Sequence, residues 1–425
     1  MGLDLDHILD MTLSAGTKGL PAEGEGLKLR DVGLQGWNLL DGTIPLPACV
    51  MRSSALSANM AAFGHYLERA GVRLAPHGKT TMSPQLFSRQ IEAGAWGMTV
   101  ATYAQARVAI ACGIRNLLIA NELVGEAEIR SLAAQNDAME DLTLLSLVDS
   151  VAGAERLNAC LDRAGALRPL EVLVELGISG GRTGARGLAS ALEVAECVTA
   201  SSHLRLRGVE GYEGLLVTGD ARADAVKVDA FLDDLLALFT TCRERGLITG
   251  EPVISAGGSA YFDLVARGLS SQDALPLLRS GCYITHDTGF YNALLRHVGD
   301  RAVLGPAPNL TSALEVWAQV LSRPEPDLVL IGAGRRDVAD DGGAPKVEAW
   351  FRPGASARPV PVTDWTFFRM NDQHGYLRVP AAADIAVGDY VALSISHPCT
   401  TFDKWPLLLE VDDDYRVTGA LKTFF

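Results

Sequence analysis

The sequence predicts a (β/α)8 TIM barrel followed by a second, mainly antiparallel β domain, and two features lead to this fold class. First, eight short apolar runs alternate with helical patterns between about residues 45 and 300, close to the ~250 residues of such a barrel. Second, the chain beyond about residue 305 shows period-2 alternation of apolar and polar residues. An open, doubly wound α/β sheet is the alternative, but no G-x-G-x-x-G motif opens the first helix after a strand.

The eight apolar runs are short and rich in Val, Ile and Leu, as expected of strands that are covered on both faces. Amphipathic segments lie between them, and several end in glycine, which is common just after a helix. The expected strands cover residues 72–77, 97–102, 116–122, 142–149, 170–177, 206–214, 251–258 and 279–287.

Three regions follow from this pattern. Residues 45–305 are expected to form the barrel, and residues 306–425 the β-rich domain, whose alternating segments are broken by Gly, Pro and Asp. Residues 1–44 are expected to contribute to the β domain, with a strand near the stretch "WNLLDGTIPLPACV".

The composition narrows the classes of partner. The 425 residues include 37 Lys and Arg against 51 Asp and Glu, a formal charge of −14, which argues against nucleic acid or an anionic membrane as the main partner. No stretch approaches the roughly 18 apolar residues of a membrane span, and the N-terminus lacks a signal-peptide pattern. Seven scattered cysteines suggest reduced thiols, so we expect a cytoplasmic protein.

Chemically capable residues cluster at the ends of the predicted strands, where a barrel enzyme places its reactive groups. They come from the stretches "PHGKT", "GGRTG", "GYEG", "SAGGS" and "CYITHD". The residues in question are His77, Lys79, Arg182, Tyr212, Gly257, Gly258, Ser259 and Tyr283.

Lys79 lies at the end of the first predicted strand. A lone lysine is most often an ordinary surface residue. Partial desolvation at a strand end, close to Arg182, would lower its pKa and leave a free amine able to act as a nucleophile. Such an amine forms a Schiff base with a carbonyl cofactor or substrate.

Gly257, Gly258 and Ser259 form a turn between a predicted strand and a predicted helix. Such a turn exposes backbone N–H groups to an anion, so a cofactor phosphate is the functional interpretation and an ordinary βα turn the alternative. Arg182 lies in a second Gly-rich stretch, from which it would reach a cofactor ring or a substrate carboxylate, or form an ion pair at the barrel rim.

The β domain contains the motif "SHPC", in which His397 and Cys399 are two residues apart. In an extended strand both side chains would project to one face, and imidazole with thiolate suits Zn²⁺. Two ligands make an incomplete site, so a buried cysteine beside a turn proline is the alternative.

Taken in order, "PHGKT", residues 93–124, "GGRTG", "GYEG", "SAGGS", "NDQHG" (371–375) and "SHPCTTFD" resemble the alanine-racemase-type (fold type III) pyridoxal phosphate enzymes. The nearest branch in this resemblance is metal-activated D-serine dehydratase (deaminase) and D-threonine aldolase. The likeness runs from about residue 45 to the end of the chain, and its motifs keep the family's order.

The resemblance implies a role for each candidate residue. Lys79 would be the Schiff-base lysine for pyridoxal phosphate, with His77 beside it and Tyr212 next to the pyridine ring. Gly257, Gly258, Ser259 and Tyr283 would lie at the phosphate, and Arg182 matches the arginine after strand five. His397 and Cys399 match the metal pair, which is H-x-C in dehydratases and usually H-x-D in aldolases.

The resemblance therefore implies metal-dependent conversion of D-serine, or a related D-β-hydroxy amino acid, to a 2-keto acid and ammonia. A D-threonine-type aldolase, and a protein that only carries pyridoxal phosphate, are the alternatives. A homodimer is the implied assembly, and the implied partner is a small-molecule D-amino acid.

Overall fold

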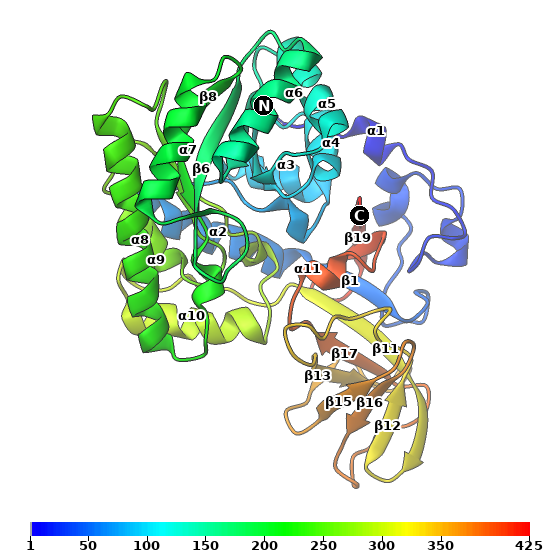
Figure 1. Cartoon of the computed structure of the whole chain (residues 1–425). Helices are drawn as coiled ribbons and strands as arrows, with labels where there is room; N and C mark the ends of the chain where they lie inside the picture. The colour runs from blue at the N-terminus through cyan, green and yellow to red at the C-terminus, as the bar shows by residue number, and fades with distance from the viewer. Residues whose placement is uncertain (1) are drawn as a thin grey trace.

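A closed parallel barrel forms the first part of the chain, in a computed structural model that describes residues 2–425 (Figure 1). The strands follow the order β2-β10-β9-β8-β6-β5-β4-β3, and a parallel bridge between His77 and Thr99 closes the ring. Their bounds are β2 (Arg73–Leu74), β3 (Met98–Val100), β4 (Asn116–Glu122), β5 (Thr143–Val148), β6 (Leu170–Gly177), β8 (Leu204–Gly211), β9 (Val253–Ala256) and β10 (Leu275–Leu278), with the short β7 (Ala185–Arg186) paired to β6. The predicted barrel is confirmed.

Helices surround the barrel, and local sequence explains where several of them begin and end. The helices are α2 (Ser53–Ala70), α3 (Pro84–Glu92), α4 (Tyr103–Ala111), α5 (Glu126–Ala138), α6 (Val151–Ala164), α7 (Leu188–Ala200), α8 (Ala221–Glu244), α9 (Phe262–Leu269) and α10 (Phe290–Arg301). The side chains of Thr102 and Ser150 accept hydrogen bonds from free N–H groups at the starts of α4 and α6, and Gly71 and Gly165 end α2 and α6 in the left-handed conformation.

The eighth strand lies earlier than predicted. We expected it at residues 279–287, but β10 ends at Leu278, and the short 3₁₀ helix η5 (Cys282–Ile284) follows. Pro276 lies inside β10 and weakens its strand pattern, because proline cannot donate to the ladder. The stretch from Arg279 to Tyr283 therefore lies outside the strand, and its side chains do not follow the alternation of a strand.

The β domain is built on a curled sheet of ten strands beside the barrel (Figure 1). Its N-terminal contribution is β1 (Ala48–Arg52), which pairs antiparallel with β11 and parallel with β18, so this strand begins a few residues beyond the region 1–44. The remaining strands are β11 (Leu314–Glu325), β12 (Leu328–Ile331), β13 (Lys346–Phe351), β14 (Val360–Pro361), β15 (Thr366–Met370), β16 (Gly375–Arg378), β17 (Tyr390–Ser394), β18 (Leu407–Val411) and β19 (Val417–Lys422), and the short helix α11 (Cys399–Phe402) lies between β17 and β18.

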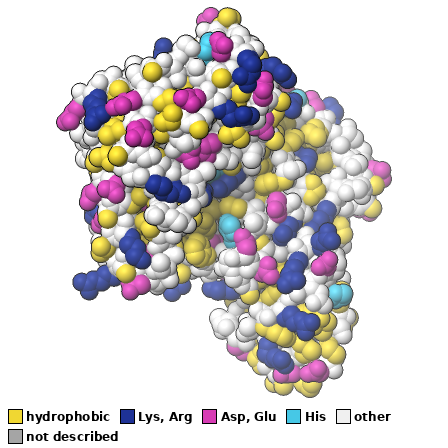
Figure 2. Space-filling view, viewed as in Figure 1, with side chains coloured by type: hydrophobic (Ala, Val, Ile, Leu, Met, Phe, Trp, Pro, Cys, Tyr) yellow, Lys and Arg dark blue, Asp and Glu magenta, His cyan; other side chains and the backbone are white. Residues whose placement is uncertain are grey.

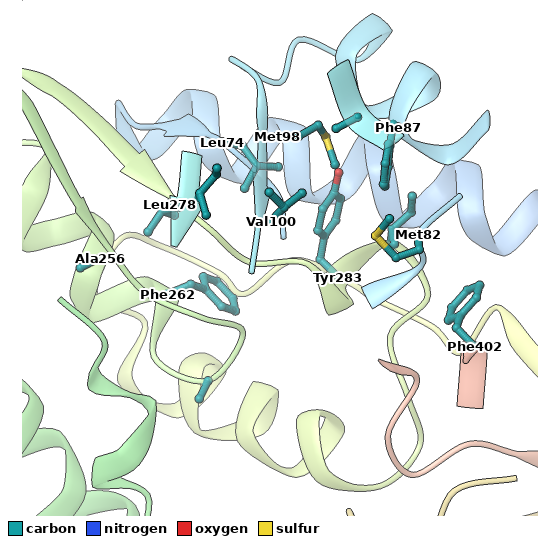
Figure 3. Packing of buried hydrophobic residues seen from close by; sticks show 14 of the residues in the cluster. Leu74, Met82, Phe87, Met98, Val100, Ala256, Phe262, Leu278, Tyr283 and Phe402 are labelled. Carbon is teal, nitrogen blue, oxygen red and sulfur yellow. The ribbon is translucent and has the colours of Figure 1, made fainter. Parts of the chain in front are cut away.

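Alternate residues of the barrel strands face two different cores. One set fills the barrel interior, namely Leu118, Leu145, Leu147, Leu173, Val253 and Leu277. The other set packs against the helices in a large cluster that also contains Phe402 of α11, so this core extends from the barrel into the β domain (Figure 3). Within residues 2–425, no helix is both long and apolar enough to span a bilayer.

Candidate active site

One cavity of about 760 Å³ opens at the carboxyl ends of the barrel strands, where the β domain meets the barrel. Figure 2 shows that the molecular surface is hollowed between these two parts of the molecule. Nine of the ten candidate residues line the cavity: His77, Lys79, Arg182, Tyr212, Gly257, Gly258, Ser259, His397 and Cys399. The structure therefore brings together residues that lie more than 300 positions apart in the chain.

Lys79 projects into this cavity from η3 (Gly78–Thr80), the single turn after β2. Desolvation by the surrounding walls lowers the pKa of its amine. The negative charge of Cys399 opposes this shift, while the positive charge of Arg182 reinforces it. Among residues 2–425, no hydrogen bond or ion pair involves this amine. The amine is therefore free to react with a ligand in the cavity.

Gly78 explains why the chain can present Lys79 here. A Cβ atom at Gly78 would lie 2.9 Å from the ring of Phe87, closer than such atoms approach in proteins. Only glycine lets η3 pack against α3 at this point. Packing thus accounts for the glycine in the local sequence "HGK".

His77 forms part of the cavity wall beside Lys79. Burial, together with the nearby positive charge of Lys79, holds its pKa well below the usual value, so the imidazole is neutral. Its Nδ1 atom is buried and has no hydrogen-bond partner within the described chain. A buried polar atom of this kind has unused capacity for a bound group.

Arg182 and Tyr212 form another wall. The guanidinium carbon of Arg182 lies 4.5 Å from the ring centroid of Tyr212, a cation–π contact. Burial and the charge of Glu213 raise the pKa of Tyr212 to about 12, so its phenol stays protonated at neutral pH. Arg182 forms no ion pair among residues 2–425, which leaves its charge available to an anionic ligand.

The turn Gly257–Gly258–Ser259 follows β9, as the sequence predicts. Gly257 has a φ of 96°, which favours glycine. The N–H of Gly258 donates to the Glu213 carboxylate at 3.2 Å, and the Oγ of Ser259 accepts from the N–H of Cys282 at 3.3 Å. One amide of the expected phosphate turn therefore already has a carboxylate partner.

Tyr283 lies away from the other nine candidates. Figure 3 shows its side chain among buried hydrophobic residues of the core. Its ring stacks on Phe63 with 4.5 Å between the ring centroids, and its hydroxyl accepts a hydrogen bond from Gln90. The cause is η5, which turns Tyr283 inward and directs its neighbour Cys282 to the cavity. The predicted role of Tyr283 at a phosphate stays a prediction. Its position in the core, outside the cavity lining, does not favour that role.

His397 and Cys399 meet at the β-domain side of the cavity, although Cys399 begins helix α11 and does not lie in the extended strand that we expected. The two side chains share a hydrogen bond, which together with Asp341 raises the pKa of His397 to about 9. Asp341 lies 2.7 Å from the Nδ1 of His397 and so orients the ring, as carboxylates behind metal-bound histidines do.

The donor set of His397 and Cys399 fits a divalent metal such as Zn²⁺, because imidazole and thiolate are its common ligands. Hydrogen bonds from Cys282 and His397 hold the pKa of Cys399 well below its usual range, which favours the thiolate. Within residues 2–425, no three His, Cys, Asp or Glu side chains form a ready metal cluster. A metal would therefore need further ligands from substrate or solvent.

Sequence reasoning missed several residues of the cavity. Arg279 lines it, forms a buried ion pair with Glu210 and donates to the Oγ of Ser255 at 2.7 Å. Cys282, Tyr291 and Thr400 also line it. Glu210 lies inside the apolar run "RGVEGY", and an acidic residue in such a run was a usable signal for a buried charge. Its partner Arg279 could not be predicted, because the eighth strand was expected at the wrong residues.

A second cavity, of about 1000 Å³, lies where the N-terminal segment meets the β domain. Its basic residues have acidic partners, including Lys18 with Asp337 at 2.8 Å and Arg336 with Asp372 at 3.5 Å. It contains none of the ten candidate residues, so the strand-end cavity is the candidate active site.

The barrel, the β domain and the lysine after the first barrel strand together define an alanine racemase-like fold. Residues 51–286 match the family "Alanine racemase, N-terminal domain", and residues 313–411 match "Putative serine dehydratase domain". The chain belongs to the alanine racemase N-terminal domain family.

Curated relatives are similar over most of their length. "D-threonine aldolase" of Arthrobacter sp is 26% identical over 372 residues, which cover 87% of this chain and 90% of the relative. "D-threo-3-hydroxyaspartate dehydratase" of Delftia sp. (strain HT23) is 27% identical over 379 residues, which cover 86% of this chain and 93% of the relative.

Solved structures show the same fold. D-threonine aldolase from Filomicrobium marinum has a TM-score of 0.74 at 24% identity, covering 91% of this chain and 97% of that one. D-threo-3-hydroxyaspartate dehydratase from Delftia sp. HT23 has a TM-score of 0.70 at 24% identity, and the match covers 91% of this chain and 99% of that one. These relatives are not named for D-serine, so the narrower expectation of a D-serine deaminase remains open.

Proposed function

We propose that this protein is a pyridoxal-phosphate- and metal-dependent lyase that converts D-serine, or a related D-β-hydroxy amino acid, to a 2-keto acid and ammonia. The observation that carries this proposal is one cavity holding both the free Lys79 amine and the His397–Cys399 pair. Relatives named as D-threonine aldolase and D-threo-3-hydroxyaspartate dehydratase support the class of substrate.

The cavity residues fit pyridoxal phosphate in their chemistry. Lys79 supplies an unpaired amine, and His77 a buried nitrogen without a partner in the described chain. The ring of Tyr212 provides a flat wall for a heteroaromatic ring. When bound, the cofactor serves as an electron sink for negative charge at the substrate Cα.

The protein's own groups would then handle protons and orientation. The lowered pKa of Lys79 increases the fraction of neutral amine, which can accept the Cα proton. Arg182 lacks an acidic partner among residues 2–425 and is available for a substrate carboxylate. The neutral phenol of Tyr212 keeps Arg182 positioned without neutralising its charge.

His397 and Cys399 would hold the metal, and Asp341 would fix the imidazole ring. A divalent metal bound there would supply Lewis-acid character for a poor leaving group such as hydroxide. The cysteine at position 399 favours elimination over cleavage between Cα and Cβ, since aspartate is the usual residue of the resembling aldolases.

A substrate panel tests the proposal. Full-length protein with pyridoxal phosphate and Zn²⁺ is given D-serine, D-threonine and D-threo-3-hydroxyaspartate, and keto acid, ammonia, glycine and aldehyde are measured. We expect keto acid and ammonia in equal amounts, and loss of both after chelation. Cofactor-bound, zinc-replete protein that yields no keto acid would disprove the proposal.

Retro-aldol cleavage is the second candidate, because the relatives include enzymes named as D-threonine aldolase and 3-hydroxy-D-aspartate aldolase. Glycine with an aldehyde, in place of keto acid and ammonia, would assign the protein to this reaction. Bound cofactor without turnover of any of the three substrates would instead indicate a cofactor-carrying protein. The homodimer remains part of the proposal and is measured by sedimentation.

A further inference from the structure

Two of the seven cysteines lie side by side in the candidate active site. The Sγ atoms of Cys282 and Cys399 are 3.5 Å apart, although 117 positions separate the residues in the chain. Both are free thiols. Cys282 comes from the barrel and Cys399 from the β domain, so the pair spans the boundary between the two parts.

The surroundings of the pair allow a bond to form. A disulfide has an S–S length of about 2.05 Å, so the sulfur atoms need to approach by about 1.5 Å. Cys282 lies in the three-residue helix η5 and Cys399 in the four-residue helix α11, and neither belongs to a sheet ladder. Both residues line the cavity, which gives a small oxidant a route to them.

We infer that Cys282 and Cys399 form an oxidisable dithiol, which a peroxide converts to a disulfide between the barrel and the β domain. In the first step the Cys399 sulfur attacks the peroxide, the O–O bond breaks, and a sulfenic acid and water form. In the second step the Cys282 sulfur attacks the sulfur of Cys399, the S–O bond breaks, and a second water leaves. Two thiols and one hydrogen peroxide thus give one disulfide and two waters.

The disulfide would switch off metal binding at the same place. Cys399 cannot supply a thiolate to a metal while its sulfur is bonded to Cys282. His397 would then keep its contact with Asp341 but lose the thiolate that completes the metal pair. This consequence rests on the proposed function, whereas formation of the disulfide does not depend on catalysis.

The test uses the full-length protein, freed of metal with a chelator and treated with a small excess of hydrogen peroxide. We expect titratable thiols to fall from seven to five, a cross-linked peptide containing Cys282 and Cys399, and recovery with dithiothreitol. Cys282→Ser should show neither the cross-link nor the paired loss. Cys197→Ser, which removes a partly exposed cysteine of α7, should still form the cross-link.

The inference fails if all seven thiols persist, if the cross-link joins other cysteines, or if Cys282→Ser still loses two thiols. Should Cys282→Ser not fold, the peptide map of the wild-type chain decides alone. Zinc added before peroxide should slow the cross-link at least tenfold. If the cross-link forms equally fast with zinc, metal binding through Cys399 is disproved while the dithiol inference stands.

Discussion

Lys79 is unusual among the lysines of this chain because its amine faces a cavity without a partner in the described residues. Replacement by alanine should abolish the visible absorbance of bound pyridoxal phosphate and reduce turnover more than about a thousandfold. Lys422 is a matched control: burial also lowers its pKa, but its amine donates to backbone carbonyls outside the cavity. Lys422→Ala should keep the absorbance, and a band that survives in Lys79→Ala would refute the assignment.

The carboxyl oxygens of Glu122, the last residue of β4, are buried and have no hydrogen-bond partner within the described residues. Burial, and then contact with Glu175, raise its pKa to about 8 from the ordinary 4.5. The folded protein therefore holds a proton that the unfolded chain releases across this range. By linkage, this carboxyl makes the free energy of unfolding fall as the pH rises from about 4.5 to 8.

Glu122→Gln should remove that decline, because the amide needs no proton to be neutral. We expect the variant to gain stability relative to the wild type between pH 5 and pH 8, by on the order of 1 kcal/mol, measured by urea unfolding at several pH values. The control Glu193→Gln changes an exposed residue of α7 and should leave the pH slope unaltered. Parallel pH slopes for Glu122→Gln and the wild type would show that Glu122 is ionised in the folded protein.

At the scale of elements, apolar runs and helix caps made the barrel predictable. Pro276 within β10 weakened the strand pattern there, so the eighth strand was predicted at residues 279–287, too late in the chain. Because of this error, Arg279 and Cys282 were not predicted as cavity residues, and Tyr283 was predicted as one although it lies in the core. The buried pair of Arg279 and Glu210 depends on the register between strands, which a single sequence does not reveal. His397 and Cys399 were found because they are neighbours in sequence, whereas Asp341 comes from a distant loop.

The single turn η3 holds the reactive amine only because Gly78 permits close packing. Gly78→Ala should destabilise the protein by about 1–3 kcal/mol, since the new methyl group meets the ring of Phe87. It should also weaken binding of pyridoxal phosphate by displacing Lys79. Unfolding by urea and cofactor titration measure the two effects.

Gly64→Ala in α2 is the control for this prediction. A Cβ atom at Gly64 has nothing within 4 Å, so the change should be neutral or stabilise the helix by up to about 1 kcal/mol. If Gly78→Ala bound the cofactor as tightly as Gly64→Ala does, the packing of η3 would not be what positions Lys79.

At the scale of the whole molecule, the barrel and the β domain act as one unit in two respects. Both contribute walls to the candidate active site, and both contribute side chains to one apolar cluster. Phe402 of α11 is fully buried in that cluster, and α11 carries Cys399 at its first position. The packing that joins the two parts therefore also places the metal motif opposite Lys79.

Phe402→Ala should reveal this coupling. Loss of the buried ring should lower the free energy of unfolding by about 3–5 kcal/mol and weaken zinc binding, because α11 loses its anchor in the shared core. Phe368→Ala removes a half-exposed ring of β15 and should cost less than about 1 kcal/mol, with zinc affinity unchanged. Urea unfolding followed by fluorescence and circular dichroism, together with zinc titration, measures both effects. Because the core is shared, we expect the wild type to unfold in one transition. Two separate transitions, or unchanged zinc binding in Phe402→Ala, would show that the β domain holds its metal motif independently of the barrel.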